Sequence, residues 1–279
     1  MKEFRDKVAI ITGAGRGIGR GIAERCAQEG MKVVLSGIGM ESLSRTEANL
    51  KAQGATVMSV QTDVSKVADI ERLAQRTMQA FGNVHLLVNN AGVNMVKSVT
   101  DLTLTDWQWV LDVNLWGVIH GVHVFLPIML EQNIECHIVN VSSLAGLISG
   151  RNFAAYCVTK HGVVTFSECL HKELLHDAAK VKVSVFCPGY VQSDIADSER
   201  NRPANLANDP SEEQFGAATI EARRGNRESL AAGMPALEAA DHVFRALRQD
   251  QFYILSHPEA NEAIQTRMQD ILQERNPPL

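Results

Sequence analysis

Tyr156 and Lys160 stand four positions apart in a stretch with helical periodicity, so their side chains project from one face. The pKa of a free tyrosine is about 10, which makes it a poor proton donor or acceptor at neutral pH. A neighbouring ammonium group lowers that pKa, so the pair can exchange a proton with a carbonyl or alcohol oxygen. Ser143 lies thirteen residues before Tyr156, after an apolar run, where an open sheet presents its ligand-binding groups. The three residues together predict a proton-transfer site, whereas many helices have a Tyr/Lys pair alone.

A second cluster is rich in glycine and lies between an apolar run and a helical segment. It contains Gly13, Ala14, Gly15, Arg16, Gly17, Ile18 and Gly19. Glycines permit a tight turn and a close backbone approach, and the start of the following helix presents free N–H groups to an anion. We therefore expect a dinucleotide pyrophosphate to bind here; the alternative is an ordinary glycine-rich turn.

Strands and helices alternate around these residues. Apolar runs predict strands at Lys7–Thr12, Lys32–Ser36, Thr56–Gln61, His85–Asn89, His137–Val141, Val181–Cys187 and Phe252–Leu255. Amphipathic patterns predict helices after the glycine turn and at Glu41–Gln53, Ser65–Phe81, Thr105–Glu131, Ala155–Asp177 and Pro235–Gln249. This alternation indicates the α/β class, with a Rossmann-type, doubly wound, mostly parallel seven-stranded sheet in the order 3-2-1-4-5-6-7.

One long polar stretch, Ile195–Gly233, interrupts this alternation and contains Pro203 and Pro210. A long insertion in a compact domain more often closes over a ligand than joins the core. We predict a single dinucleotide-binding and catalytic domain over residues 1–279, with residues 193–235 inserted as a substrate lid.

Composition argues against several classes of protein. Hydrophobic residues make up 45% and charged residues 21% of the 279 residues, which is typical of a soluble globular protein. The net charge is −5 without a basic run, so we expect no nucleic-acid partner. No signal peptide and no apolar run of about 18 residues is evident, so we expect no membrane partner. Five cysteines without a C-x-x-C pair, and no metal-ligand spacing, predict reduced thiols in the cytoplasm and no metal.

The sequence resembles the short-chain dehydrogenase/reductase family from Lys7 to about Leu255. Four motifs support the resemblance: T-G-x-x-x-G-x-G at 12–19, N-N-A-G at 89–92, the Ser143, Tyr156 and Lys160 set, and Pro188-Gly189-x-Val191-x-Ser193, where serine replaces the usual threonine. The resemblance is weakest between residues 193 and 235. It implies a Rossmann-type oxidoreductase that forms a homodimer or homotetramer.

The resemblance also implies a role for each motif residue. Tyr156 would be the general acid/base, Ser143 would orient and polarise the substrate oxygen, and Lys160 would lower the tyrosine pKa and hold the nicotinamide ribose. Asn114, on the long helix before Ser143, matches an asparagine that keeps a water in the proton relay. The remaining implied cofactor contacts are Asp63 and Val64 for adenine, Asn90, Ala91 and Gly92 for ribose, and Pro188, Gly189, Val191 and Ser193 for the nicotinamide amide. For Asp63, a helix N-cap is the alternative.

The end of the second strand bears on the choice of dinucleotide. NAD-binding sites usually place an acidic residue there for the ribose 2′-OH, but here Gly37 follows Ser36, and Glu41 comes later. Arg16 and the Ser36 hydroxyl could bind a 2′-phosphate instead. NADP(H) is therefore the preferred prediction, with NAD(H) the alternative, although Ile38 stands where NADP-dependent relatives often have arginine.

We accordingly predict an NAD(P)(H)-dependent oxidoreductase that interconverts a secondary alcohol and a ketone, with Tyr156 exchanging the proton. Leu144, Leu147, Ile148, Phe153 and Met95 predict a moderately apolar small-molecule substrate. Two alternatives stay open: a dinucleotide-binding regulatory protein on the same scaffold, and NAD-dependent alcohol oxidation as the physiological direction. An epimerase or dehydratase is a third and weaker alternative.

Overall fold

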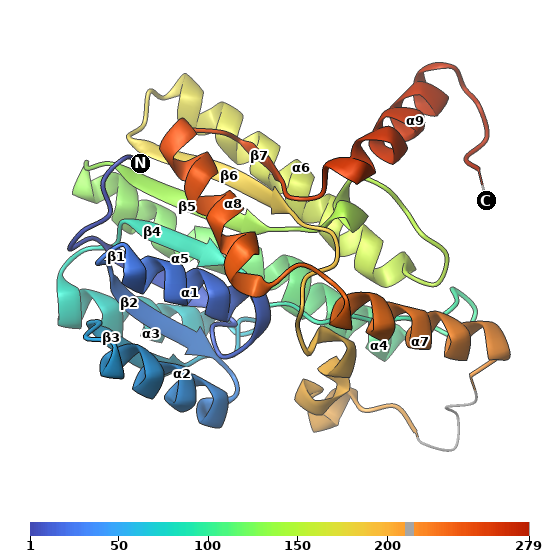
Figure 1. Ribbon diagram of the computed structural model, residues 1–279, viewed down its shortest axis with the longest axis horizontal. Coiled ribbons are helices and arrows are strands. Elements are labelled where there is room, and N and C mark those ends of the chain that lie inside the picture. Colours follow the sequence, from blue (N-terminus) through green and yellow to red (C-terminus); the bar gives the residue numbers. More distant parts are fainter. Residues whose placement is uncertain (210–214, 279) are drawn as a thin grey trace.

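The computed structural model describes residues 1–209 and 215–278. Its centre is a parallel sheet of seven strands in the order β3-β2-β1-β4-β5-β6-β7, which confirms the predicted order (Figure 1). The strands are β1 (Val8–Thr12), β2 (Lys32–Gly37), β3 (Val57–Gln61), β4 (Leu86–Asn89), β5 (Cys136–Val141), β6 (Val181–Cys187) and β7 (Tyr253–Leu255). Because every strand runs the same way, the segments that follow them meet at one edge.

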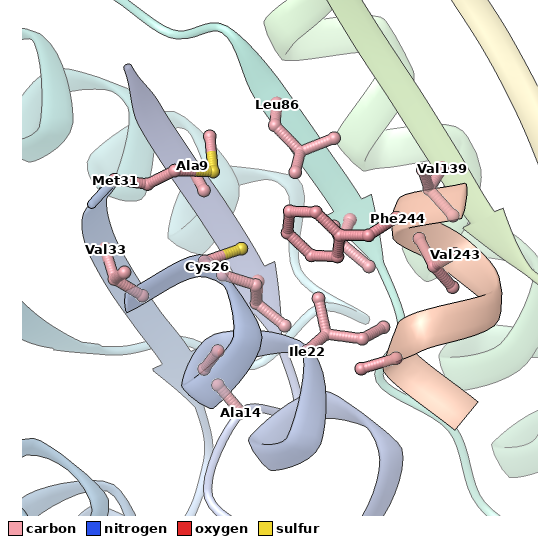
Figure 2. Close-up of a cluster of buried hydrophobic side chains, with 14 of the residues drawn as sticks. Ala9, Ala14, Ile22, Cys26, Met31, Val33, Leu86, Val139, Val243 and Phe244 are labelled. Carbon is pink, nitrogen blue, oxygen red and sulfur yellow. The ribbon is translucent and has the colours of Figure 1, made fainter. Parts of the chain in front are cut away.

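Helices cover both faces of this sheet, which explains why the strands are apolar on both sides. One face packs against α1 (Gly17–Gln28), α2 (Met40–Ala52) and α8 (Ala236–Gln249). The other packs against α3 (Val67–Phe81), α5 (Gly117–Gln132) and α6 (Ala154–His176). Figure 2 shows the first core, where Ile22 and Cys26 of α1 lie against Phe244 of α8 above the sheet. This core joins the start of the chain to α8 and β7 and holds α1 in place.

The helix predicted for Thr105–Glu131 is continuous but not uniform. It consists of α4 (Leu104–Leu111), a π-helical turn (Asp112–Trp116) and α5. Its mean hydropathy of 1.6 and its length would suffice to cross a membrane, alone among the helices in the described residues. It contacts α3, α6, β4 and β5, as a core helix does. That no membrane is bound stays a prediction.

The polar insertion contains two 3-10 helices, Ile195–Asn201 and Ala204–Leu206, and the helix α7 (Ala217–Ala231). Pro210, which the sequence analysis placed in this stretch, lies outside the described residues. The last element predicted from the sequence is the strand at Phe252–Leu255, but a 3-10 turn (Pro258–Ala260) and the helix α9 (Asn261–Leu272) follow it. In Figure 1, α9 stands away from the sheet. A helix that packs little against the sheet needs no continuous apolar face, which is the pattern from which helices are predicted.

Candidate active site

A cleft of about 370 Å³ runs along the edge of the sheet where the strands end. The structure brings together there most of the residues that the sequence predicts for catalysis and cofactor binding. The predicted residues that line it are Gly13, Gly15, Arg16, Gly17, Ile18, Gly37, Asn90, Ala91, Gly92, Ser143, Tyr156, Lys160, Pro188, Gly189, Val191 and Ser193. They come from the ends of β1, β2, β4, β5 and β6 and from α6, so only the parallel sheet makes them neighbours.

The glycine-rich turn shows why most of its glycines are required. Gly13 and Gly17 have φ values of +66° and +49°, in the left-handed region that favours glycine. At Gly19, a Cβ would lie 2.4 Å from both the Gly13 carbonyl oxygen and the Asn90 amide nitrogen. The turn therefore has room for backbone only, and the N-terminus of α1 opens into the cleft.

Hydrogen bonds of Thr12 and Asn90 hold this turn in place. No role for Thr12 was predicted from the sequence. The Thr12 hydroxyl accepts hydrogen bonds from the backbone N–H groups of Asn90 and Ala91, at 2.9 and 3.0 Å. The Asn90 side-chain amide donates in turn to the Thr12 carbonyl at 2.7 Å. The N-N-A-G motif thus fixes the glycine turn, and Thr12 could have been found from the motif that it opens.

Tyr156 and Lys160 project from α6 into the cleft as predicted. Burial raises the pKa of Tyr156 to about 12, and a hydrogen bond with Ser143 opposes that rise. Burial lowers the pKa of Lys160 to about 8. The Lys160 Nζ donates to the Val141 carbonyl at 3.0 Å and lies 5.5 Å from the Tyr156 ring centroid. The pKa of Tyr156 is therefore raised rather than lowered as expected from Lys160. The partly buried phenol and the buried ammonium nevertheless lie side by side in the cleft, where a ligand oxygen can reach them.

Two adjacent serines follow β5, and their surroundings differ. The Ser142 hydroxyl is buried and donates to the Lys160 carbonyl at 2.8 Å, so it helps to hold the helix. The Ser143 hydroxyl accepts from the Ala145 N–H at 3.1 Å and donates to the Pro188 carbonyl at 3.5 Å, and it opposes the rise in the pKa of Tyr156. Of the two, Ser143 has the hydroxyl that is placed beside the phenol.

Asn114 lies in the π-helical turn and is fully buried, outside the residues that line the cleft. Its side-chain oxygen accepts from the Val93 N–H at 2.8 Å, and its nitrogen donates to the Val93 carbonyl at 2.9 Å and to the Thr159 hydroxyl at 3.3 Å. π-turns are common at functional sites, and here the turn fixes the segment after β4 beside Lys160. The water relay implied for Asn114 stays a prediction.

Four further predicted contacts also lie outside the lining of the cleft: Gly19, Ser36, Asp63 and Val64. Ser36 is fully buried in β2, and its hydroxyl has no hydrogen-bond partner. The Asp63 carboxylate accepts from the backbone and hydroxyl of Ser65, at 3.1 and 2.7 Å. Helix α3 begins after Lys66, so neither Asp63 nor Ser65 is its N-cap. The five residues predicted to make an apolar pocket, from Met95 to Phe153, also lie outside this cleft.

The cleft includes residues that the sequence analysis did not assign to it. From the turn after β2 and the start of α2 come Ile38, Gly39, Glu41, Ser42 and Leu43. From the 193–235 segment come Asp194, Ile195, Ser198, Arg200, Asn201 and Leu230. The rule that strand ends bind ligands could have found the first group. The second group depends on how the polar insertion folds back, which no local pattern indicates.

Arg16 and Asp194 form an ion pair across the cleft, between the glycine turn and the 193–235 segment. Each side chain is about half exposed. The Arg200 guanidinium donates to the Asp194 carbonyl at 2.8 Å and the Asp197 carbonyl at 2.6 Å. The Arg16 charge is therefore partly satisfied by a carboxylate before any ligand binds.

A buried ionic cluster attaches the 193–235 segment to α4. Asp106 is fully buried and pairs with Lys97 at 2.8 Å and with Arg202 at 2.7 Å. Burial alone would raise the pKa of Asp106, but hydrogen bonds from Lys97, Asn208, Thr103 and Arg202 hold that pKa well below its usual range. The Arg202 guanidinium also lies 5.0 Å from the Trp109 ring centroid. Three distant parts of the chain meet at this carboxylate.

Known proteins are similar to this chain in sequence and in structure. A family model described as short chain dehydrogenase matches residues 7–204. The chain belongs to the short-chain dehydrogenase family. It is 34% identical over 278 residues to the CLA biosynthesis dehydrogenase/reductase of Lactiplantibacillus plantarum, covering 99% of this chain and 97% of that protein. It is 30% identical to the C alpha-dehydrogenase of a Sphingobium species, covering 98% and 87%.

Among solved structures, a short-chain dehydrogenase/reductase from Burkholderia phymatum in complex with NAD is similar throughout. It has a TM-score of 0.97 and 43% identity, with 100% of this chain and 99% of that chain covered. This short-chain dehydrogenase is thus an oxidoreductase whose family binds NAD(P). Its own residues fit a dinucleotide, because the glycine turn admits only backbone and the start of α1 opens onto it. Within the described residues, no three His, Cys, Asp or Glu side chains gather as a metal site.

Proposed function

We propose that this dehydrogenase interconverts a secondary alcohol and a ketone with a nicotinamide dinucleotide, and that Tyr156 exchanges the proton. The observation that supports it best is the Ser143, Tyr156 and Lys160 arrangement at the same strand edge as the glycine turn. A protein that only binds a dinucleotide has no need of a phenol beside a buried ammonium at this edge. This argues against a regulatory binding protein.

In ketone reduction, Tyr156 donates its hydroxyl proton to the carbonyl oxygen as that oxygen gains negative charge. Ser143, which lines the same cleft as Tyr156, orients the same oxygen. The Lys160 ammonium stabilises the phenolate that remains. When bound, the nicotinamide supplies the hydride for reduction or accepts it for oxidation. In alcohol oxidation, Tyr156 takes the proton instead.

Cofactor binding is assigned to the residues that line the cleft. Gly13, Gly15, Arg16, Gly17 and Ile18 would hold the pyrophosphate by backbone and dipole. The segments after β4 and β6 would hold the ribose and the nicotinamide, at Asn90, Ala91 and Gly92 and at Pro188, Gly189, Val191 and Ser193. The segment 193–235, the lid from here on, would close the cleft within a single catalytic domain.

For the dinucleotide itself, we propose NAD(H). The NADP(H) preference predicted from the sequence needs the Arg16 and Ser36 side chains, but Arg16 pairs with Asp194 and Ser36 is buried. Glu41 lines the cleft beside Gly39, where its carboxylate would accept from a ribose hydroxyl and repel a 2′-phosphate. The Burkholderia phymatum relative binds NAD. With NAD⁺, alcohol oxidation is the proposed direction.

A titration of the purified protein with NADH and NADPH, followed by cofactor fluorescence, tests this choice. We expect the tighter dissociation constant for NADH, and Glu41→Gln should narrow the difference because a neutral amide no longer repels a phosphate. Tighter binding of NADPH by the wild type would restore the preference predicted from the sequence.

The substrate is proposed to be a small, moderately apolar alcohol, because Ile195 and Leu230 of the lid line the cleft. A cytoplasmic homodimer or homotetramer without a metal, membrane or nucleic-acid partner is proposed with it. A panel of apolar secondary alcohols with NAD⁺, followed by NADH formation, tests the activity. Turnover that requires Tyr156 supports the proposal, and turnover that persists in Tyr156→Phe contradicts it.

A further inference from the structure

His257 follows β7 and lies against the turn that follows β6. The two strands pair in parallel, with Cys187 beside Leu255, so the segments that leave them emerge side by side. The Gly189 N–H donates to His257 Nδ1 at 3.0 Å, and His257 Nε2 lies 3.2 Å from the Tyr190 carbonyl oxygen. A Cβ on Gly189 would lie 2.8 Å from two ring atoms, so the ring packs directly on this glycine.

These contacts determine which ring nitrogen of His257 carries the hydrogen. A backbone N–H can only donate, so Nδ1 must accept and is unprotonated. The ring hydrogen is then on Nε2, which donates to the Tyr190 carbonyl. The Ser256 hydroxyl also lies 2.9 Å from Nδ1, whose single lone pair already accepts from the Gly189 N–H. In this tautomer His257 bonds both the N–H and the C=O of the turn.

The turn held in this way lines the cleft with Pro188, Gly189 and Val191. Its Pro188 carbonyl accepts from the Leu144 N–H at 2.8 Å, which joins it to the segment that bears Ser143. The Tyr190 carbonyl also accepts from the Met234 N–H at 2.9 Å, where the lid ends. His257 therefore contacts a turn that connects the proton-transfer site to the lid.

We propose that His257 is a positioning residue that sets the Pro188–Val191 turn for the nicotinamide end of the cofactor. The proposal rests on the proposed function. It predicts an effect confined to that end, because the glycine turn that receives the pyrophosphate makes none of these contacts. ADP-ribose, which has every part of NAD except the nicotinamide, is the matched ligand that separates the two ends.

Three substitutions of His257 test its bonds to the Gly189 N–H and to the Tyr190 carbonyl separately. The Asn oxygen of His257→Asn lies two bonds from Cβ, like Nδ1, and keeps the acceptor for Gly189. In His257→Gln, the amide nitrogen lies three bonds from Cβ, like Nε2, and keeps only the donor. His257→Ala loses both. His176→Asn, at an exposed position at the end of α6, is the control.

Dissociation constants for NADH and ADP-ribose are measured by fluorescence and by competition on each variant. We expect His257→Ala and His257→Gln to weaken NADH binding about tenfold, the scale of one lost hydrogen bond at a partly buried N–H, and to leave ADP-ribose binding within about twofold. His257→Asn should restore most of the NADH affinity. If the alanine variant does not fold, the Asn and Gln variants decide.

Unchanged NADH binding in His257→Ala and His257→Gln overturns the proposal. Equal weakening of NADH and ADP-ribose also overturns it, because that pattern is a general loss of structure. Failure of His257→Asn to improve on His257→Gln does the same. A wild type that binds neither ligand overturns the proposed function together with this inference, which is a distinct result.

Discussion

The floor of the cleft and the lid above it are held in place by different interactions. The floor consists of strand ends and glycines, and its geometry depends on backbone atoms and on neutral hydrogen bonds such as those of Thr12 and Asn90. The lid is held by charges, with Asp106 buried at one anchor and Arg16 exposed at the other. With the proposed function, this difference predicts a fixed cofactor site and a lid with one firm and one weak attachment.

The largest effect is expected on the floor. Tyr156→Phe removes the exchangeable proton, so we expect kcat to fall by roughly 10²- to 10⁴-fold with NADH affinity nearly unchanged. Steady-state kinetics and a fluorescence titration measure the two. Tyr253→Phe is the control, because that hydroxyl is bonded to Glu168 outside the cleft. Substantial turnover in Tyr156→Phe would contradict the proposal that Tyr156 exchanges the proton.

The buried anchor of the lid at Asp106 should contribute strongly to the free energy of unfolding. Asp106→Ala leaves the buried charges of Lys97 and Arg202 without their shared carboxylate, which should lower the free energy of unfolding by about 3–5 kcal/mol. Asp194→Ala removes only the exposed partner of Arg16, and about 0–1 kcal/mol is expected. Urea denaturation measures both. Similar losses in the two variants would show that the anchors do not differ as described.

Gly19→Ala tests whether the glycine turn in the floor has room for a side chain. The added Cβ meets the Gly13 carbonyl and the Asn90 amide at 2.4 Å, so the glycine turn must shift and NADH binding should weaken about tenfold. Gly225→Ala in α7 is the matched control, because its Cβ has no atom within 4 Å. Helix propensity should make that variant slightly more stable, with unchanged binding. Normal NADH affinity in Gly19→Ala would contradict the geometry of the turn.

A smaller effect follows from the charge of Lys160, whose pKa is lowered from 10.5 to about 8. As pH rises through about 8 the ammonium is lost, so kcat/KM should fall about fivefold between pH 8 and pH 9. The free energy of unfolding should instead rise with pH over this range. Between about 8 and 10.5 the unfolded chain binds more protons at this lysine, so its destabilising contribution is full below pH 8 and disappears toward 10.5. A flat activity profile across this range would contradict the role of the ammonium.

The floor was largely predictable from the sequence. The insertion at 193–235 was predicted as a segment, but the contacts that hold it were not. Strand ends follow from apolar runs that stop at glycine or asparagine, and a parallel sheet then brings Gly13, Asn90 and Ser143 to one edge. The glycine spacing and the Tyr156/Lys160 pair are local patterns. The π-turn at Asn114 was not predictable, because the residues around it favour a regular helix.

The lid depends on pairings between distant positions. Lys97, Asp106 and Arg202 come from three segments, and each alone is typical of a solvated charge. The role given to Arg16 ignored Asp194, which is 178 positions away. Helix α9 was missed because its few apolar residues, among them Met268 and Ile271, are half exposed in a polar segment.

Equilibrium binding of NADH to the wild-type protein tests the central claim most directly. Saturable enhancement of nicotinamide fluorescence, reversed by NAD⁺ and by ADP-ribose, is the predicted result. The same titration of Tyr156→Phe should give nearly the same dissociation constant without turnover of any alcohol. Absence of NADH binding by the folded wild type would contradict the assignment of the cleft as a dinucleotide site.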